Sequence, residues 1–572
     1  MLLRSLLFPA LLLLLLACDD IAVGSRDTGA GDALLVDAGP ADTAMLDAAD
    51  AHAAGDASSG ADAGDAASED ATSSVPFQTG TEVSTSLGSL RGREDGDDLR
   101  VFRGIPYARP PIGELRLRAP QPAEPWDGVR EVDDYGPSCP QAMLTFNATD
   151  EDCLSLNVWA HQDSIPRPVM VWIYGGGFMI GETAMLAYDA ADLARDADVV
   201  VVTLNYRLGA LGYLAIPELQ AEDPSGAVGT LGLLDQIEAL RWVRANAPAF
   251  GGDPDNITVF GESAGAMSTC ALIGAPLADG LFHKAIVQSG SCALFPVLDG
   301  DSPLGPSAFD SGERIMQNLG CAEASDRLAC LRALPVEDLA QAIDSMALMS
   351  VLHTEVAIGP AVDGVVLPQL PYARIVSGDA PARPMIVGSN GNEAPLFTST
   401  EVILTYLDFE NALAELFGDA DLAAEVVALY SVLEYPVAKD AFDAFVGEIL
   451  FNCNSYHAAQ SLDGLGYAYH LENGPGALMS VHGPLHGSDI FYVFGNFTSS
   501  GLVPSLLDLD LSARMQQAWG SFARTGVPNW EGGWPALQGE DPQHLAIGLF
   551  TDLDGNFRGG HCDALQTLGV LP

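Results

Sequence analysis

A serine lies between two glycines where an expected strand meets an expected helix. Residues 256–260 (NITVF) are mostly β-branched or aromatic and predict a strand, residues 261–265 read GESAG, and residues 266–273 are compatible with a helix. A strand, a sharp turn and a helix around G-x-S-x-G are typical of a nucleophile elbow. The neighbours of the serine must lack bulk so that the strained turn can close and a substrate can approach. We therefore interpret Ser263 as a nucleophile, and the alternative is a serine that only caps the helix.

Three glycines follow another expected strand. Residues 168–174 (PVMVWIY) are nearly all apolar, as in a sheet that is covered on both faces, and residues 175–177 are glycine. Backbone N–H groups in such a loop can point into a cavity, which suits an oxyanion hole for acyl transfer. The alternative is a simple flexible turn.

The elements around these motifs predict an α/β chain. Residues 83–90 and 151–158 alternate as strands do, and residues 199–204 predict a second buried strand. Residues 229–243 carry apolar residues at helical spacing. Repeated alternation of strand and helix predicts a mostly parallel sheet flanked by helices, in a domain that begins near Phe77.

Together these stretches resemble the type-B carboxylesterases, the cholinesterase-like branch of the α/β-hydrolases. The resemblance runs from about residue 80 to the end of the chain and rests on residues 101–113, 151–157, 172–178, 229–265, 279–282 and 285–290. It implies an α/β-hydrolase fold with inserted helical regions over the sheet. It also implies hydrolysis of carboxylic esters by a Ser–His–Glu triad, in the chain order Ser, acid, His. Such chemistry needs no metal or organic cofactor, and the sequence has no cysteine–histidine cluster with zinc spacing.

The resemblance indicates where the other two members of the triad lie. Glu393 follows a short expected strand in the setting that the family uses for its acid, although Ala394 stands where the family has glycine. Asp363 is the competing acid. His486 precedes a Val-Phe-Gly segment, as the family's histidine does, and His482, which is also followed by glycine, is the competing base.

These residue types fit one mechanism. A serine hydroxyl is a poor nucleophile at neutral pH and needs a base with a pKa near 7, which histidine supplies. The carboxylate of Glu393 would fix the imidazole tautomer and stabilise the imidazolium. The oxyanion would lie against the backbone N–H groups of Gly176, Gly177 and Ala264.

The cysteines favour disulfides. There are nine, and eight remain when Cys18 near the N-terminus is set aside for lipid; an even number is typical of an exported chain with disulfides. The resemblance implies three pairs, which are Cys139–Cys153, Cys321–Cys330 and Cys453–Cys562. Cys270 and Cys292 remain, and the sequence leaves open whether they pair or stay free.

The N-terminal residues predict export. Residues 1–18 contain Arg4, an almost all-leucine run and the ending LLAC, which resembles a bacterial lipobox with Cys18 as the lipidated residue. The lipid would then hold a cell-envelope lipoprotein at a membrane, and the alternative is an ordinary signal peptide of a secreted protein. Residues 19–75 are rich in Ala, Asp and Gly and lack aromatic residues, so they predict a disordered acidic tether before the esterase domain at 76–572.

Composition and one loop bear on the substrate. The formal net charge of -52 argues against binding to nucleic acid or to an anionic surface. In cholinesterases a tryptophan in the loop of the first cysteine pair binds the choline ammonium by cation–π attraction. Residues 140–152 have no tryptophan, and Phe146 is their one aromatic residue. We expect a broad-specificity carboxylesterase for short or aryl esters; the alternatives are a hydrolase of carbamates, lactones or amides, and a non-catalytic binding or adhesion module.

Overall fold

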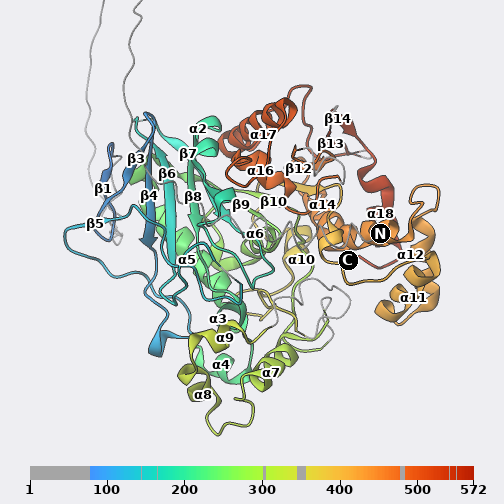
Figure 1. Ribbon diagram of the computed structural model, residues 1–572, viewed down its shortest axis with the longest axis horizontal. Coiled ribbons are helices and arrows are strands. Elements are labelled where there is room, and N and C mark those ends of the chain that lie inside the picture. Colours follow the sequence, from blue (N-terminus) through green and yellow to red (C-terminus); the bar gives the residue numbers. More distant parts are fainter. Residues whose placement is uncertain are drawn as a thin grey trace, which may run out of the picture. The chain divides into compact units, whose positions relative to one another are not determined.

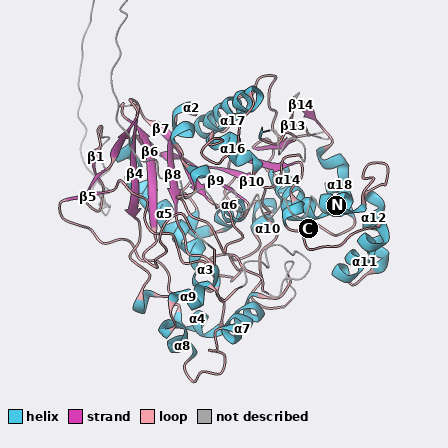
Figure 2. Cartoon of the chain, viewed as in Figure 1, coloured by secondary structure: helices cyan, strands magenta, loops and turns pink. Residues whose placement is uncertain are grey.

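A computed structural model describes residues 78–571, except 144, 164, 301–304, 344–355, 477–482, 540–541 and 549–550. The predicted signal segment with Cys18, the predicted tether and His482 lie outside the described residues. Figure 1 shows the course of the chain, and Figure 2 shows its helices and strands.

The central element is a sheet of eleven strands in the order β14-β13-β12-β11-β10-β9-β7-β8-β6-β4-β3. The strands are β3 (Arg93–Asp95), β4 (Leu99–Pro106), β6 (Ser155–His161), β7 (Arg167–Ile173), β8 (Val200–Leu204), β9 (Gly252–Glu262), β10 (Lys284–Gln288), β11 (Met385–Asn390), β12 (Gly466–Leu471), β13 (His544–Ile547) and β14 (Asp552–Asp554). All neighbours from β8 across to β13 are parallel, and antiparallel strands flank them on both sides. The predicted mostly parallel sheet is therefore confirmed.

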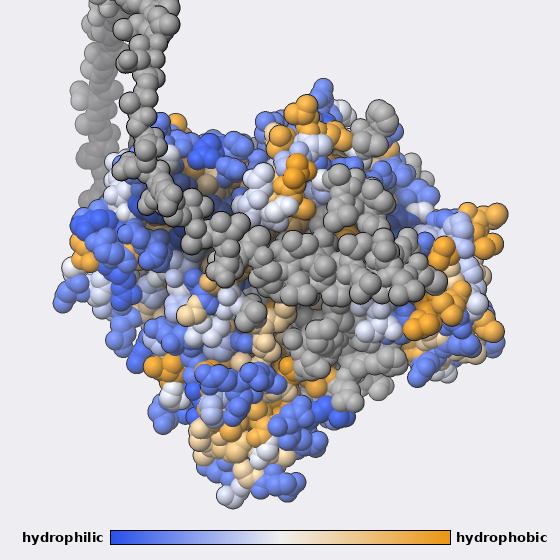
Figure 3. Space-filling model, in the orientation of Figure 1, coloured by the Kyte–Doolittle hydropathy of each residue, from blue (hydrophilic) through white to orange (hydrophobic). Residues whose placement is uncertain are grey.

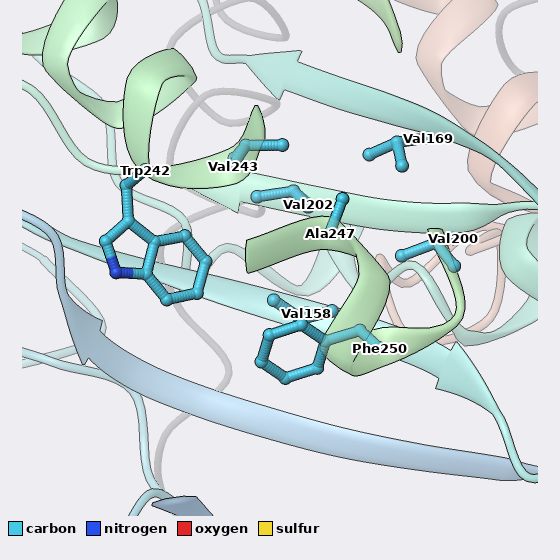
Figure 4. Close-up of a pocket in the computed structure, with 8 residues that line it drawn as sticks. All are labelled: Val158, Val169, Val200, Val202, Trp242, Val243, Ala247 and Phe250. Atoms are coloured by element: carbon cyan, nitrogen blue, oxygen red, sulfur yellow. The ribbon is translucent and has the colours of Figure 1, made fainter. Parts of the chain in front are cut away.

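Helices cover one face of the sheet through a tightly packed apolar layer. Helix α5 (Leu231–Asn246) and the 3-10 turn η3 (Ala247–Phe250) lie on this face. Figure 4 shows Trp242 and Phe250 with the sheet valines Val158 and Val202, which line the same layer. The space between these side chains is only about 10 Å³, at the lower limit for one water molecule, so the layer is closely packed.

The opposite face is also covered, as the apolar strand at 168–174 predicts. Trp172 of β7 and Phe260 of β9 lie on this side, with ring centroids 4.9 Å apart, and Phe494 lies 4.9 Å from Trp172. The helices here are α2 (Ala191–Asp196), α16 (Ser488–Phe494) and α17 (Leu506–Thr525). Every residue of β7 and β8 is buried in consequence.

Two groups of inserted helices complete the fold (Figure 1). One surrounds a second apolar cluster and consists of α3 (Gly209–Tyr213), α4 (Pro217–Glu222), α7 (Ala308–Asn318), α8 (Arg327–Ala333) and α9 (Val336–Ala340). The other consists of α10 (Pro371–Val376), α11 (Tyr406–Phe417), α12 (Ala420–Leu429), α13 (Ala438–Gly447), α14 (Cys453–Gln460) and α18 (His561–Thr567). Apolar side chains such as Leu407 and Leu416 are exposed on α11, where Figure 3 shows apolar surface.

None of the helices in the described part of the chain combines the length and the apolar character that a membrane span requires.

The prediction of one strand over residues 83–90 is wrong. The segment forms two short antiparallel strands, β1 (Glu82–Ser84) and β2 (Ser89–Arg91), and β2 also pairs with β5 (Val129–Glu131) in a separate sheet. A turn separates them, in which the N–H group and the hydroxyl of Thr85 both donate to the carbonyl of Gly88. The alternation of the sequence continues through this turn, which explains why it resembles one strand.

All four cysteine pairs are disulfides, including the pair that the sequence left open. Cys270 lies on α6 (Ala264–Gly274), the helix after the expected nucleophile, and it bonds to Cys292 beyond the end of β10. Both cysteines are fully buried. Four disulfides favour an exported protein, because reducing compartments rarely preserve them.

Removing the Cys270–Cys292 bond is expected to destabilise the protein by about 3 kcal/mol, because the bond closes a loop of 22 residues. The variant Cys270→Ala/Cys292→Ala should therefore unfold at a lower urea concentration than the parent protein. The variant Cys321→Ala/Cys330→Ala, whose bond closes a separation of 9 residues, should lose somewhat less. An unchanged urea midpoint for the first variant would contradict the expected contribution.

Candidate active site

The predicted strand, turn and helix around Ser263 are present. Strand β9 ends at Glu262, α6 begins at Ala264, and Ser263 between them has φ 56° and ψ -123°, a conformation that L-residues rarely adopt. The two flanking glycines are needed for the close packing of this turn. A Cβ atom on Gly261 would lie 2.4 Å from the carbonyl oxygen of Gly265, and one on Gly265 would lie 2.0 Å from that of Ile173.

Glu393 and His486 meet at the same end of the sheet. Glu393 follows β11, His486 precedes α16, and the two loops run side by side, with the N–H group of Asn392 donating to the carbonyl of Pro484 at 2.9 Å. Oε2 of Glu393 lies 2.6 Å from Nδ1 of His486. A carboxylate can only accept, so Nδ1 donates, and in the neutral imidazole the lone pair lies on Nε2.

The carboxylate of Glu393 is buried and fully engaged. Its residue is 3% exposed, and its second oxygen accepts from the hydroxyl of Ser289 at 2.6 Å and from the N–H group of Asn390 at 2.5 Å. These bonds fix the carboxylate with one oxygen toward the imidazole. Because Ser289 follows β10 and Glu393 follows β11, adjacent parallel strands deliver this arrangement.

Asp363, the competing acid, has other partners. Its carboxylate accepts from the backbone N–H groups of Val365, Val366 and Leu367 at 2.8–3.0 Å, as in a turn that it stabilises. It makes no hydrogen bond to a histidine within the described part of the chain. The competing base, His482, is outside the described residues.

Glu262 is a third carboxyl group at this site, and the sequence interpretation gave it no role. It is 4% exposed, and its Oε1 lies 3.2 Å from Nε2 of His486. Burial raises the pKa of Glu262 to about 8, against the opposing charge of His486. Burial would lower the pKa of His486, but the charge of Glu262 and the hydrogen bond to Glu393 outweigh it and raise that pKa to about 9. An ionised Glu262 therefore favours the protonated imidazole.

The glycine loop after β7 lies against the elbow. Gly175 is buried, and a Cβ atom on it would lie 2.9 Å from Cβ of Ser263 and 2.6 Å from Oε2 of Glu262. Gly176 and Gly177 have φ values of 115° and 59° and are partly exposed. In the described part of the chain, the N–H group of neither glycine donates a hydrogen bond. Both donors are thus available to a bound group.

Two aromatic rings flank the imidazole. The ring of Phe451 is 4.4 Å from that of His486, and the ring of Phe397 is 4.9 Å from it. Apolar surroundings strengthen the electrostatic interactions among His486, Glu262 and Glu393. Within the described ranges, no group of three or more His, Cys, Asp or Glu side chains could hold a metal ion.

Of the predicted residues, Glu393 and His486 are in direct contact, and Gly175 of the glycine loop lies against Ser263. His486 lies beside Glu262, the residue before Ser263, and its Nε2 has no hydrogen-bond partner in the described part of the chain. The structure also adds residues without a predicted role, which are Glu262, Ser289 and Asp489. Asp489 is buried and accepts from Tyr469 and from Gln288 behind the histidine. Of the three added residues, only Glu262 stands directly beside a predicted site residue in the sequence, whereas the contact of Ser289 depends on the pairing of β10 with β11.

Comparisons with known proteins agree with this geometry. The chain matches the carboxylesterase family over residues 79–565. It is 34% identical over 481 residues to a para-nitrobenzyl esterase of Bacillus subtilis, covering 81% of this chain and 94% of the relative. It is 32% identical to a cholinesterase of Mus musculus over 512 residues, covering 81% and 83%.

A solved carboxylesterase of Geobacillus stearothermophilus superposes with a TM-score of 0.74 at 33% identity, over 85% of this chain and 99% of that one. Esterases of this kind have the α/β-hydrolase fold, which confirms the expected fold. A strained serine elbow, a buried Glu–His pair and the family match over most of the chain lead to one conclusion: the chain belongs to the carboxylesterase family of serine ester hydrolases.

Proposed function

We propose that Ser263, His486 and Glu393 hydrolyse carboxylic esters through an acyl-enzyme intermediate. The observation that carries this proposal is the 2.6 Å hydrogen bond from His486 to the buried Glu393, at the end of the sheet that holds the strained Ser263 turn. This bond leaves Nε2 of the imidazole as the proton acceptor. Strain at Ser263 is stored in a well-packed turn, as is usual at functional sites.

Acylation begins when Oγ of Ser263 attacks the ester carbonyl and its proton moves to Nε2 of His486. The carbonyl oxygen becomes an oxyanion, which the N–H groups of Gly176, Gly177 and Ala264 would face. Each well-placed donor stabilises the transition state by about 3 kcal/mol. Ala264 is the first residue of α6, so its N–H group belongs to the positive end of a helix.

The second half of the cycle reuses the same groups. His486 gives its proton to the leaving alcohol, and the acyl group stays on Ser263. A water molecule then loses a proton to His486 as it attacks the acyl carbonyl, and the carboxylic acid leaves as Oγ recovers the proton. Glu393 stays ionised throughout and stabilises the imidazolium.

The site favours uncharged esters with apolar or aryl groups. Phe397 and Phe451 stand against the imidazole, and the loop 140–152 contains no tryptophan for a cationic alcohol. One relative is named a para-nitrobenzyl esterase, which agrees with an aryl substrate. We therefore propose short acyl and aryl esters rather than choline esters.

Turnover of p-nitrophenyl acetate by the purified protein, together with covalent labelling by a fluorophosphonate, tests this function. We expect hydrolysis, and we expect the label on the peptide that contains Ser263. A folded protein that shows neither turnover of any ester nor labelling would overturn the proposal and favour the non-catalytic binding module. Turnover of carbamates, lactones or amides in preference to esters would reassign the substrate class.

Glu262→Gln is expected to move the acid limb of the kcat/KM profile to lower pH by about 1 unit. His486 must be neutral to accept the proton of Ser263, so activity falls as the pH drops through its pKa. The Glu262 charge raises that pKa, so its removal lets the imidazole stay neutral at lower pH. The control is Glu238→Gln, a buried carboxyl on α5 that pairs with Arg241. A limb that stays in place or moves to higher pH would contradict the assigned interaction.

We also propose that residues 1–18 direct export and that Cys18 carries the lipid of a cell-envelope protein, with residues 19–75 as a tether to the esterase domain at 76–572. The four disulfides support export. The support for the lipid is the lipobox-like ending of the leucine run. Mass spectrometry of the N-terminal peptide from the native host tests it, and an unmodified N-terminus beyond Cys18 would exclude the lipid.

A further inference from the structure

Glu182 is a buried carboxylate close to the glycine loop, and the mechanism gives it no role. The residue is 3% exposed. Its carboxylate accepts from the hydroxyl of Ser138, from the N–H group of Phe146 at 2.5 Å and from the N–H group of Asn147 at 3.3 Å. In the described part of the chain it has no ion pair with a basic side chain. A buried charge without a cation is costly, so these three donors must hold the carboxylate.

All three donors belong to one stretch of chain around the Cys139–Cys153 disulfide. The disulfide closes a separation of 14 residues, and Ser138 lies just outside it. Ser138 is tied to the same loop, because its N–H group donates to the carbonyl of Ala148 at 3.0 Å. Glu182 thus binds both sides of the closed loop at once.

Gln141 of the same loop makes a second connection, one residue before Glu182. Its Nε2 donates to the carbonyl of Gly181 at 2.9 Å, and its Oε1 accepts from the N–H group of Gly181 at 2.9 Å. The amide of Gln141 thus bonds to both the N–H group and the carbonyl group of Gly181, as the backbone of a paired strand does. Residues 181 and 182 are therefore held to the loop by five hydrogen bonds.

Close packing connects residue 181 to the glycines that face the ester. A Cβ atom on Gly181 would lie 2.5 Å from the ring of Tyr174 and 2.7 Å from the carbonyl oxygen of Gly175. The segment turns back on itself, because the N–H group of Ile180 donates to the carbonyl of Gly176 at 3.1 Å. A displacement of residues 181–182 would thus be transmitted to Gly176 and to Gly175, which lies against Ser263.

We infer that Glu182 and Gln141 are positioning residues that brace the segment 175–182 against the disulfide-closed loop and so set the direction of the N–H groups of Gly176 and Gly177. The inference rests on the proposed function, in which these groups bind the oxyanion. Oxyanion donors act only when they are held in place before the reaction, and a shift of about 1 Å costs about 100-fold in rate. The brace acts on the transition state and leaves ester binding almost unchanged.

Glu182→Gln and Gln141→Ala test the brace in the full-length protein. Each is expected to lower kcat for p-nitrophenyl acetate by about 10- to 100-fold, with KM changed by less than about 3-fold. In each variant, the inhibition constant of an aryl trifluoromethyl ketone should rise by about the same factor as kcat falls. Ser263 adds to that ketone and forms a hemiketal whose oxyanion needs the same donors. Because both residues act through one segment, the double variant should lose less than the product of the single losses.

Asp508→Asn is the matched control. Asp508 is a buried carboxylate that also accepts from loop N–H groups, those of Ser505 at 2.7 Å and Gly476 at 3.2 Å, but it lies at the start of α17. The substitution Asp508→Asn should lower the melting temperature without changing kcat or the ketone affinity. Gln141→Ala removes no charge, so it tests the brace even where Glu182→Gln folds poorly.

If Glu182→Gln and Gln141→Ala lower the melting temperature but leave kcat and the ketone affinity unchanged, the positioning role is wrong, and Glu182 only stabilises the loop. Parallel changes in KM and kcat would overturn the positioning role as well, because the substrate-binding surface would then have moved. Failure of the proposed function looks different, since the parent protein itself would lack turnover and labelling, and it would remove the inference together with its basis.

Discussion

Ser263→Ala should lower kcat/KM on p-nitrophenyl acetate by about 10⁵-fold or more, to the background rate. The substitution removes the one atom that forms the covalent bond and keeps the Cβ atom of the turn. No remaining group on the elbow can replace it, because the neighbours are Glu262, which is buried, and Ala264. The oxyanion donors alone leave only a small fraction of the rate.

The fold should tolerate this change. The strain at Ser263 lies in its backbone, and alanine has the same φ preference, so the cost of the turn is nearly unchanged. Within the described part of the chain, the hydroxyl group of Ser263 makes no hydrogen bond that the substitution would remove. The melting temperature should therefore stay close to that of the parent protein, and the fluorophosphonate label should disappear.

Ser268→Ala is the control on the same helix. Ser268 is buried, and its hydroxyl accepts from Gln236 at 3.0 Å rather than facing the site. This variant should keep its turnover and its label. Residual turnover in Ser263→Ala that is inhibited by the fluorophosphonate would mean that another nucleophile exists, and the assignment of Ser263 would fail.

The elbow was predictable because its signal is local. Only glycine fits at positions 261 and 265. A Cβ atom on Gly261 would lie 2.4 Å from the carbonyl oxygen of Gly265 in the same turn, and one on Gly265 would lie 2.0 Å from that of Ile173 in the adjacent strand β7. A short sequence window therefore carries the whole pattern. The apolar strand at 168–174 was predictable for a similar reason, since burial on both faces leaves a continuous apolar run.

The support of the triad was not predictable, because strand order creates it. Ser289 reaches Glu393 across 104 residues, and Glu262 reaches His486 across a still longer separation, only because β9, β10 and β11 are neighbours in the sheet. The sequence shows where each strand is but not which strand lies beside it. The Cys270–Cys292 bond depends on the same neighbourhood, since α6 follows β9 and Cys292 follows β10.

The residues assigned by resemblance have a different basis. Glu393 and His486 were located from the family's order of residues, and the structure places them 2.6 Å apart. Ala394 in place of the family's glycine does not prevent this contact. The resemblance favoured Glu393 over Asp363 as the acid, and the backbone contacts of Asp363 give it a separate structural explanation.

His486→Ala should lower kcat by about 10⁵-fold, almost as much as the loss of the nucleophile. Without the imidazole, the hydroxyl proton of Ser263 has no acceptor when the carbonyl is attacked. Glu262 lies beside this position, but burial raises its pKa, and loss of the His486 charge would raise it further, so in this variant the carboxyl group keeps its proton at pH 7. It is therefore a poor substitute base at pH 7.

The comparison with His482→Ala decides between the two candidate histidines. If His486 is the base, His482→Ala should keep most of its turnover, and the ratio of the two kcat values should exceed about 10³. The reverse ranking would assign the base to His482 and reduce the Glu393–His486 bond to a structural contact.

The double variant Ser263→Ala/His486→Ala adds a test of cooperation. A nucleophile and its base form one unit, so the second substitution should cost almost nothing once the first is present. Two independent losses that multiply would mean that His486 acts on some other step. Because His486 also contacts Glu262 and its loss should raise the pKa of that carboxyl group further, the same variants should be compared at pH 7 and at pH 9, where more of the carboxyl group is ionised. Activity of His486→Ala that recovers at pH 9 would identify Glu262 as a reserve base.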